Sequence, residues 1–215
     1  MPRYPYSRSS FSFGPGPLST AMKALIGVNV GMFLLLLFLP GEAIDLLGLV
    51  PALVIRKLWI WQLGTYMFLH GSVSHVLFNM LALWMFGSDI ERVWGPRRFL
   101  TYYFVCVISA AVAQLLVAEM AGGTPYPTIG ASGGVYGVLL AFGMMFPRRM
   151  VVLLFPPIRM PAWLLVTLYG VLELLLGVTG TQAGVAHFAH LGGMAGGFLL
   201  IQYWRGRLPI KPGRR

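Results

Sequence analysis

The sequence contains few charged residues and a single cysteine. Of its 215 residues, only 10% are charged and 57% are hydrophobic, whereas a soluble domain usually carries about 25% charged residues. This balance argues against an ordinary soluble domain and predicts a polytopic membrane protein. The single cysteine, Cys106, lies in an apolar run. It excludes an internal disulfide, and its surroundings show no metal-binding spacing.

Acidic residues are especially scarce, with 6 Asp and Glu against 16 Lys and Arg and a net charge of +10. The basic residues form short clusters between apolar runs instead of one face or one helix, so we do not predict nucleic-acid binding. They are typical of topology signals. Residues 1–20 also lack the apolar core and cleavage site of a signal peptide, and we interpret them as a short disordered cytosolic tail.

Long apolar runs predict an all-α fold with six transmembrane helices. The runs lie at about 21–39, 75–88, 97–118, 132–147, 161–177 and 186–204. Residues 21–204 are therefore expected to form one membrane domain, followed by a basic cytosolic tail at 205–215. Several runs are shorter than the ~20 residues of a full span, so protein or a water-filled cavity must flank them.

The basic residues also predict the orientation of the helices. When alternate loops are assigned to opposite sides, fourteen Lys and Arg fall on one side and two, Arg56 and Lys57, on the other. By the positive-inside rule, both termini and the loops near 90 and 150 are cytosolic. The first outer loop, residues 40–74, is amphipathic and rich in aromatic residues. We expect it to form short segments at the membrane interface.

Three polar residues are predicted to lie at one depth in the membrane. Ser132, His190 and His75 each precede the cytosolic end of their predicted helix by 14 or 15 residues, which corresponds to ~21–22 Å of helix. In a hydrocarbon core ~30 Å thick, all three then lie some ~8 Å below the outer face. Ionisable residues inside membrane spans are costly and indicate function.

These residue types suit nucleophilic catalysis. A serine hydroxyl needs a neighbouring base, which an imidazole such as His190 can supply to Ser132. The carbonyl under attack develops negative charge and needs hydrogen-bond donors. His75 and Asn79, spaced i and i+4 on one helix face, can present two of them. The glycines beside Ser132 let backbone N–H groups approach closely, and the start of the following helix adds a favourable dipole.

Three motifs carry a close resemblance to the rhomboid family. They are His70-Gly-Ser-Val-Ser-His75-Val-Leu-Phe-Asn79, then Gly130-Ala-Ser132-Gly133 with Tyr136, and then Ala189-His190-Leu-Gly-Gly193 with Gly197. They occur in the family's order over roughly residues 21–204, on its second, fourth and sixth helices. The resemblance implies a Ser132–His190 dyad without an aspartate. It also implies an oxyanion site made by His75, Asn79 and the Ser132 backbone N–H, with Tyr136 packed against His190.

The same resemblance implies an intramembrane serine endopeptidase that works through an acyl-enzyme and needs no cofactor or metal. Its implied partners are single-pass membrane proteins in the lipid bilayer, which reach the site laterally between helices two and five. They carry a small residue before the scissile bond and helix-weakening residues beyond it. We expect a plasma membrane location, because no targeting peptide is evident, and a site that opens to the outer face.

Several residues also have competing interpretations. Gly130-x-Ser132-x-Gly134 fits the nucleophile elbow of a soluble α/β-hydrolase, with Glu173 in the matching chain position. A serine in a membrane helix can also simply ease helix packing. A further alternative is a non-enzymatic protein that binds or moves membrane helices on the same scaffold.

Other polar and small residues are interpreted as structural. Gly193 and Gly197 form a small-xxx-small pair that is expected to pack the sixth helix against the fourth. His187 is expected to be solvated or bonded to a loop. For Glu173 a role in assisting the dyad is conceivable, but we favour a carboxylate that extends outward to the loop or bonds a gate.

Overall fold

A computed structural model of the protein describes residues 17–122, 127–153, 157–180 and 185–210. The chain is mostly helical, as the composition predicts. Its helices are α1 (Thr20–Leu36), α2 (Glu42–Leu47), α3 (Pro51–Lys57), α4 (Gln62–Thr65), the 3-10 turn η1 (Tyr66–Phe68), α5 (Val73–Ala82), the π-helical turn η2 (Leu83–Gly87), α6 (Ser88–Trp94), α7 (Pro96–Met120), α8 (Ser132–Met145), α9 (Ala162–Thr179) and α10 (His187–Trp204). Two short strands, β1 (Met150–Val152) and β2 (Arg159–Pro161), were not predicted.

Each predicted apolar run coincides with a long helical segment of the described chain. The second run is longer than expected, since α5, η2 and α6 continue without a break from Val73 to Trp94. Among the described residues, three helices are long and apolar enough to cross a membrane: Val73–Trp94, Pro96–Met120 and Ala162–Thr179. Thr20–Leu36 and Ser132–Met145 are shorter apolar helices.

Local sequence explains where several of these helices begin and end. The Ser72 hydroxyl accepts a hydrogen bond from the His75 backbone N–H at 3.1 Å, which caps the start of α5. Pro96 occupies the first turn of α7, where its missing N–H costs nothing. Gly180, with φ of 64°, ends α9 in the left-handed conformation that glycine accepts most readily. The cap at Ser72 fixes the position of His75 on the first turn of α5.

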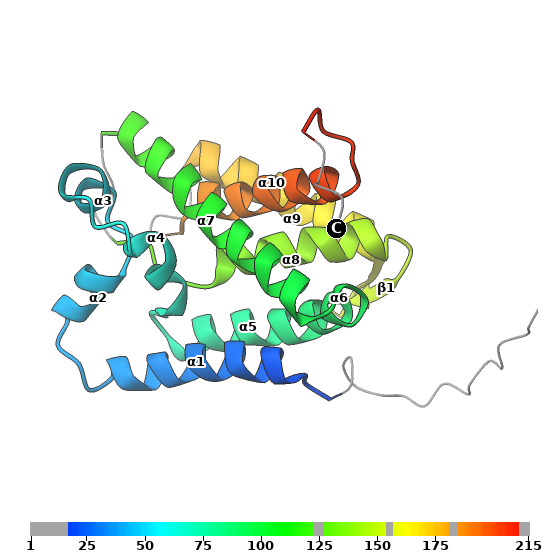
Figure 1. The fold of residues 1–215 in the computed structure, drawn as a ribbon, viewed down its shortest axis with the longest axis horizontal. Coiled ribbons are helices and arrows are strands. Elements are labelled where there is room, and N and C mark those ends of the chain that lie inside the picture. Colours follow the sequence, from blue (N-terminus) through cyan, green and yellow to red (C-terminus); the bar gives the residue numbers. More distant parts are fainter. Residues whose placement is uncertain (1–16, 123–126, 154–156, 181–184, 211–215) are drawn as a thin grey trace, which may run out of the picture.

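The last helix, α10, lies against both α7 and α8 (Figure 1). A Cβ added to Gly193 would lie 2.0 Å from the Gly133 carbonyl oxygen on α8, so the two backbones meet directly. Gly193 therefore packs the sixth long helix against the fourth, as predicted. The prediction is wrong for Gly197, whose added Cβ would lie 2.2 Å from the Tyr102 hydroxyl on α7. The stripe of small residues on α10 faces two neighbours because the helix lies in the groove between them.

The first outer loop is folded into α2, α3, α4 and η1 at one end of the bundle (Figure 1). Its short helices are tied by side-chain bonds to backbone carbonyls, including Thr65 Oγ1 to Leu47 at 2.6 Å and Gln62 Nε2 to Asp45 at 2.8 Å. The loop also pairs with the segment before α8, through an antiparallel bridge between Leu49 and Thr128. The outer loop and the Ser132 segment are thus one connected structure.

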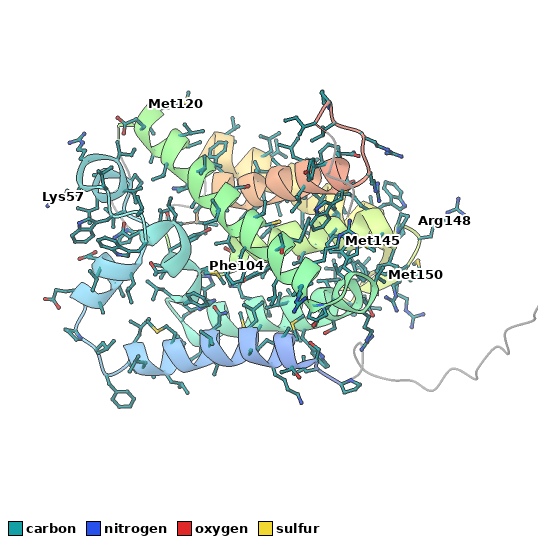
Figure 2. The ribbon with its side chains drawn as sticks, viewed as in Figure 1. Lys57, Phe104, Met120, Met145, Arg148 and Met150 are labelled. Atoms are coloured by element: carbon teal, nitrogen blue, oxygen red, sulfur yellow. The ribbon has the colours of Figure 1, made fainter. Side chains whose placement is uncertain are left out.

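Basic residues from several loops lie at one end of the bundle. Lys57 lies at the end with α2 and α3, whereas Arg148 and Met150 lie at the opposite end with α6 and β1 (Figure 2). At that second end Arg149 pairs with Asp89 at 2.5 Å, and Arg98 lies 4.2 Å above the Trp204 ring. The basic loops near residues 90 and 150, which were predicted to lie on the same side of the membrane, therefore gather at one end of the molecule.

Several sequence predictions can be compared directly with this architecture. The nucleophile-elbow hypothesis is wrong: the strands of the described chain are β1 and β2, both beyond α8, and residues 129–131, which directly precede Ser132, are not part of a strand. Residues 1–16 of the predicted N-terminal tail and 211–215 of the predicted basic tail lie outside the described residues. Helix α1 begins at Thr20, one residue before the predicted start.

Candidate active site

Ser132 is the first residue of α8, and a glycine turn delivers it there. Gly130 has φ of 120°, a conformation that residues with a Cβ rarely adopt. Its N–H donates to the Tyr66 carbonyl at 3.0 Å, which anchors the turn to η1. A Cβ at Gly130 would lie 2.7 Å from His75 Nε2. Only glycine therefore allows the loop to pass this close to the His75 ring.

His190 meets Ser132 from the first turn of α10. The distance between His190 Nε2 and Ser132 Oγ is 2.7 Å, and the two residues are 58 positions apart in the chain. The Gly193–Gly133 contact one turn away brings α10 and α8 close enough for this bond. Tyr136 stacks on the His190 ring with centroids 4.3 Å apart and an interplanar angle of 6°. The structure thus brings together the serine, the histidine and the tyrosine singled out in the sequence.

His75 and Asn79 lie together on α5 beside the serine. The His75 Nδ1 accepts a long hydrogen bond from the Gly71 N–H at 3.4 Å, an arrangement in which the ring proton is on Nε2, the nitrogen facing Gly130. Asn79 donates one amide hydrogen to the His75 carbonyl at 2.9 Å, and its second amide hydrogen remains for another acceptor. Both side chains can therefore donate toward the space beside Ser132.

His70 supports this corner from the outer loop. Its ring packs edge-on against His75, with centroids 4.9 Å apart. Burial, and then the neighbouring His75 ring, lower the pKa of His70 to about 4. His70 is therefore neutral at physiological pH and adds no positive charge beside the site.

The candidate site opens into a cavity of about 1140 Å³. Its lining includes Ser132, His190, His75 and Asn79. The rest is mostly apolar and is formed by residues of α5, α8, α9, β1 and the loop before α8. Helix α5 packs on α1 and α8, and α9 packs on α8 and α10. The cavity therefore extends between α5 and α9, the second and fifth long helices.

Glu173 on α9 also joins the site, and the prediction that it extends outward is wrong. The side chain is buried, and Oε2 lies 2.6 Å from His187 Nδ1 and 2.9 Å from His190 Nδ1. The other oxygen, Oε1, accepts a hydrogen bond from the Tyr136 hydroxyl. Two hydrogen bonds and the nearby His190 ring compensate the carboxylate inside the bundle better than a stretch toward the loop would.

His187 likewise differs from its prediction. It was expected to be solvated or bonded to a loop, yet it is buried and bonded to Glu173. Two sequence signals could have indicated this network. His187 and His190 are spaced i and i+3 and so share one face of α10. Glu173 lies 12 residues, or ~18 Å, from the predicted cytosolic start of its helix, close to the depth predicted for Ser132.

The family model described as "Rhomboid domain" matches residues 57–207, which include every residue of this site. The chain belongs to the rhomboid family. Its curated relatives include Rhomboid protease GluP of Bacillus subtilis (strain 168), 30% identical over 149 residues, a match covering 68% of this chain and 26% of that protein. Rhomboid protein 1, mitochondrial, of Saccharomyces cerevisiae is 31% identical over 144 residues, covering 63% of this chain and 39% of that protein.

A third rhomboid relative, Presenilin-associated rhomboid-like protein A, mitochondrial, of Danio rerio, is 35% identical over 150 residues. That match covers 66% of this chain and 38% of the relative. The chain therefore spans between about a quarter and two fifths of the length of these rhomboid relatives. Together with its apolar helices, membership of the family makes the chain a multi-pass membrane protein.

In this rhomboid chain, Glu173, His187 and His190 are also the residues whose ligand atoms gather as they would around a metal ion. A tetrahedral zinc ion with bonds of about 2.0–2.2 Å would hold its ligand atoms roughly 3.3–3.5 Å apart. The separations of 2.6 and 2.9 Å from Glu173 Oε2 are shorter and match charge-assisted hydrogen bonds. As arranged, the cluster fits a network of proton donors around a carboxylate better than a metal centre.

Proposed function

We propose that the protein is an intramembrane serine endopeptidase. The observation that carries this proposal is the 2.7 Å contact between Ser132 Oγ and His190 Nε2 in the wall of a mostly apolar cavity. A serine bonded to an imidazole is the arrangement of an activated nucleophile. The name of one rhomboid relative, Rhomboid protease GluP, supports a proteolytic role.

In the proposed mechanism, Ser132 Oγ attacks the peptide carbonyl while His190 Nε2 takes its proton. The electron pair of the carbonyl moves to its oxygen, which becomes an oxyanion. The donors for that oxyanion are His75 Nε2, the free amide hydrogen of Asn79 and the backbone N–H of Ser132. Because Ser132 begins α8, its N–H is one of the four that have no partner within the helix.

The oxyanion then collapses, the peptide C–N bond breaks, and His190 returns its proton to the leaving amine. An acyl-enzyme remains on Ser132. Water attacks this ester with the same residues in reverse roles, which releases the second product and restores the hydroxyl. Each proton that leaves a nucleophile thus passes through His190, and the two residues form the working dyad.

The shape of the cavity supports substrates that are themselves membrane helices. Its apolar lining suits a hydrophobic segment, and its extension between α5 and α9 supports lateral access from the bilayer. A regular helix locks its backbone in i to i−4 hydrogen bonds and cannot extend into the site. We therefore propose single-pass membrane proteins with a small residue before the scissile bond and helix-weakening residues beyond it.

The proposed arrangement in the membrane has six spans with both termini in the cytosol. The charge bias of fourteen basic residues against two supports this orientation. Ser132 then opens toward the outer face, where water can reach it. We propose the plasma membrane as the location.

Labelling with a fluorophosphonate probe tests the proposed chemistry without knowledge of the substrate. The purified wild type in lipid is expected to react with the probe. Ser132→Ala should not react, and His190→Ala should react at a small fraction of the wild-type rate. Unlabelled wild type, or equal labelling of Ser132→Ala, would overturn the proposal. The first result would fit a protein that binds membrane helices without cleaving them.

A further inference from the structure

Glu173 projects from the middle of α9 toward the side of the His190 ring that faces away from Ser132. Its carboxylate is buried, and it lies on the opposite side of the His190 ring from Ser132: Nε2 contacts the serine and Nδ1 faces Glu173 Oε2 at 2.9 Å. Among the described residues, Nδ1 makes no hydrogen bond, and its 2.9 Å approach to Glu173 Oε2 is an ion-pair contact. The Nδ1–H does not point straight along the line to Oε2, and the better aligned bond to that oxygen comes from His187.

The two contacts of His190 together determine which ring nitrogen carries the proton. A neutral imidazole has one N–H and one acceptor nitrogen. A carboxylate oxygen beside Nδ1 stabilises a proton there and repels a lone pair. With the proton on Nδ1, Nε2 is the acceptor, and only an acceptor can take the hydrogen of the Ser132 hydroxyl. The opposite tautomer would leave the dyad unable to start the reaction.

We propose that Glu173 is a positioning residue that holds His190 in this tautomer and stabilises the imidazolium formed when Ser132 attacks. This inference rests on the proposed protease function, and it adds a third member to the serine–histidine pair. Glu173 does not take a proton in the step. The Ser132 proton goes to His190 Nε2, the new bond forms between Oγ and the substrate carbon, and the carboxylate remains an anion that faces the cation.

The surroundings of Glu173 support this role. The carboxylate is hydrogen-bonded by His187 and by the Tyr136 hydroxyl, and His190 Nδ1 approaches it at 2.9 Å, so it has the kind of partners that an ionised group requires when it is buried. Tyr136 also stacks on the His190 ring. One tyrosine therefore fixes both the carboxylate and the ring plane, so that the distance between Glu173 and His190 is held from two sides.

A purely structural role for Glu173 predicts a different result from a positioning role. Glu173→Gln keeps the shape and can still bond Tyr136, but its neutral amide no longer favours a proton on Nδ1. Glu173→Asp keeps the charge but withdraws it by one methylene and leaves a gap. If Glu173 only packs α9 against α10, Asp is the more harmful change. If it positions His190, Gln is the more harmful change for the chemistry.

The first experiment measures the second-order rate of fluorophosphonate labelling of folded protein. Glu173→Gln is expected to react up to about 10,000-fold more slowly than wild type, which is the loss seen when the acid of a serine-protease triad becomes an amide. Glu173→Asp should react at least ~10-fold faster than Glu173→Gln, because it retains the anion. The matched control is Glu119→Gln, at an exposed site near the end of α7, which should leave the rate unchanged.

The second experiment reads the tautomer directly and does not depend on activity. The chain has four histidines, so the ¹⁵N imidazole spectrum is simple, and His190→Ala identifies the His190 signals. His190 in the wild type should carry its proton on Nδ1, and in Glu173→Gln the proton should move to Nε2. A wild type that fails to label would refute the protease function, and this spectrum would still decide the role of Glu173.

Three results would overturn the inference. They are a Glu173→Gln variant that labels at the wild-type rate, an Asp variant slower than the Gln variant at equal thermal stability, or a His190 tautomer that is the same with and without the carboxylate.

Discussion

Gly130 shows how much of the site depends on one residue without a side chain. Its positive φ and its closeness to His75 are both required for the loop that presents Ser132. Gly130→Ala is expected to slow fluorophosphonate labelling by at least ~10-fold, because the left-handed conformation costs roughly 1–2 kcal/mol and the new methyl group displaces the His75 ring. The labelling rate and the thermal midpoint of the purified variant are the measurements.

Gly95 offers a matched control for that prediction. It also has a positive φ, of 78°, but no atom lies within 4 Å of an added Cβ. Gly95→Ala should therefore lose a similar amount of stability while labelling at the wild-type rate. If Gly130→Ala behaves like Gly95→Ala, the contact with His75 does not matter to the site.

At the residue scale, the sequence predicted the residues that belong to motifs. It did not predict the roles of residues whose contacts are made with a neighbouring helix. Ser132 and His190 were found because charge bias oriented the helices and residue counts gave their depth. The contacts of Glu173 and His187 depend on how α9 is rotated about its own axis relative to α10. A hydrophobic helix in a membrane gives little sign of this rotation, since most of its faces are apolar.

Helix packing provides a prediction at the scale of the element. Gly193→Ala places a methyl group 2.0 Å from the Gly133 carbonyl oxygen, which is backbone and cannot turn away. The two helices must separate, so the variant should unfold at a clearly lower temperature and lose most of its labelling. We expect a loss of about 1–3 kcal/mol, the usual range for overpacking a tight contact.

The control for Gly193 is a glycine on a helix with room around it. Gly27 lies in α1, and an added Cβ there would meet no atom within 4 Å. Gly27→Ala should preserve both stability and labelling, since alanine is the better helix former. A Gly193→Ala variant as stable as Gly27→Ala would contradict the close approach of α8 and α10.

Elements outside the apolar runs were the least predictable part of the fold. The short helices α2, α3 and α4 were expected only as interfacial segments, and the β1–β2 hairpin was not expected at all. Each is brief and is stabilised by contacts with the rest of the bundle, such as the Thr65–Leu47 and Gln62–Asp45 bonds. A long apolar run can be identified as a helix from the sequence alone, whereas a short element forms only through contacts with its neighbours.

Charge provides a prediction for the whole molecule. Lys57 and Arg148 lie at opposite ends of the bundle (Figure 2). We introduce a cysteine at each position in a separate variant and add a membrane-impermeant maleimide. Lys57→Cys should react in intact cells. Arg148→Cys should react only after the membrane is opened. Cys106 is buried and provides little background. Reversed accessibility would show that the charge bias had been assigned to the wrong side.

The link between the outer loop and the serine loop has a consequence for the whole protein in its lipid. Leu49 pairs with Thr128, and Tyr66 accepts the N–H of Gly130, so two backbone connections join the loop helices to the turn before Ser132. A stacked pair of tryptophans, Trp59 and Trp61, belongs to the same loop, and such rings favour the headgroup layer. We therefore expect that a change in bilayer thickness shifts this loop and, through the two backbone connections, the turn that presents Ser132.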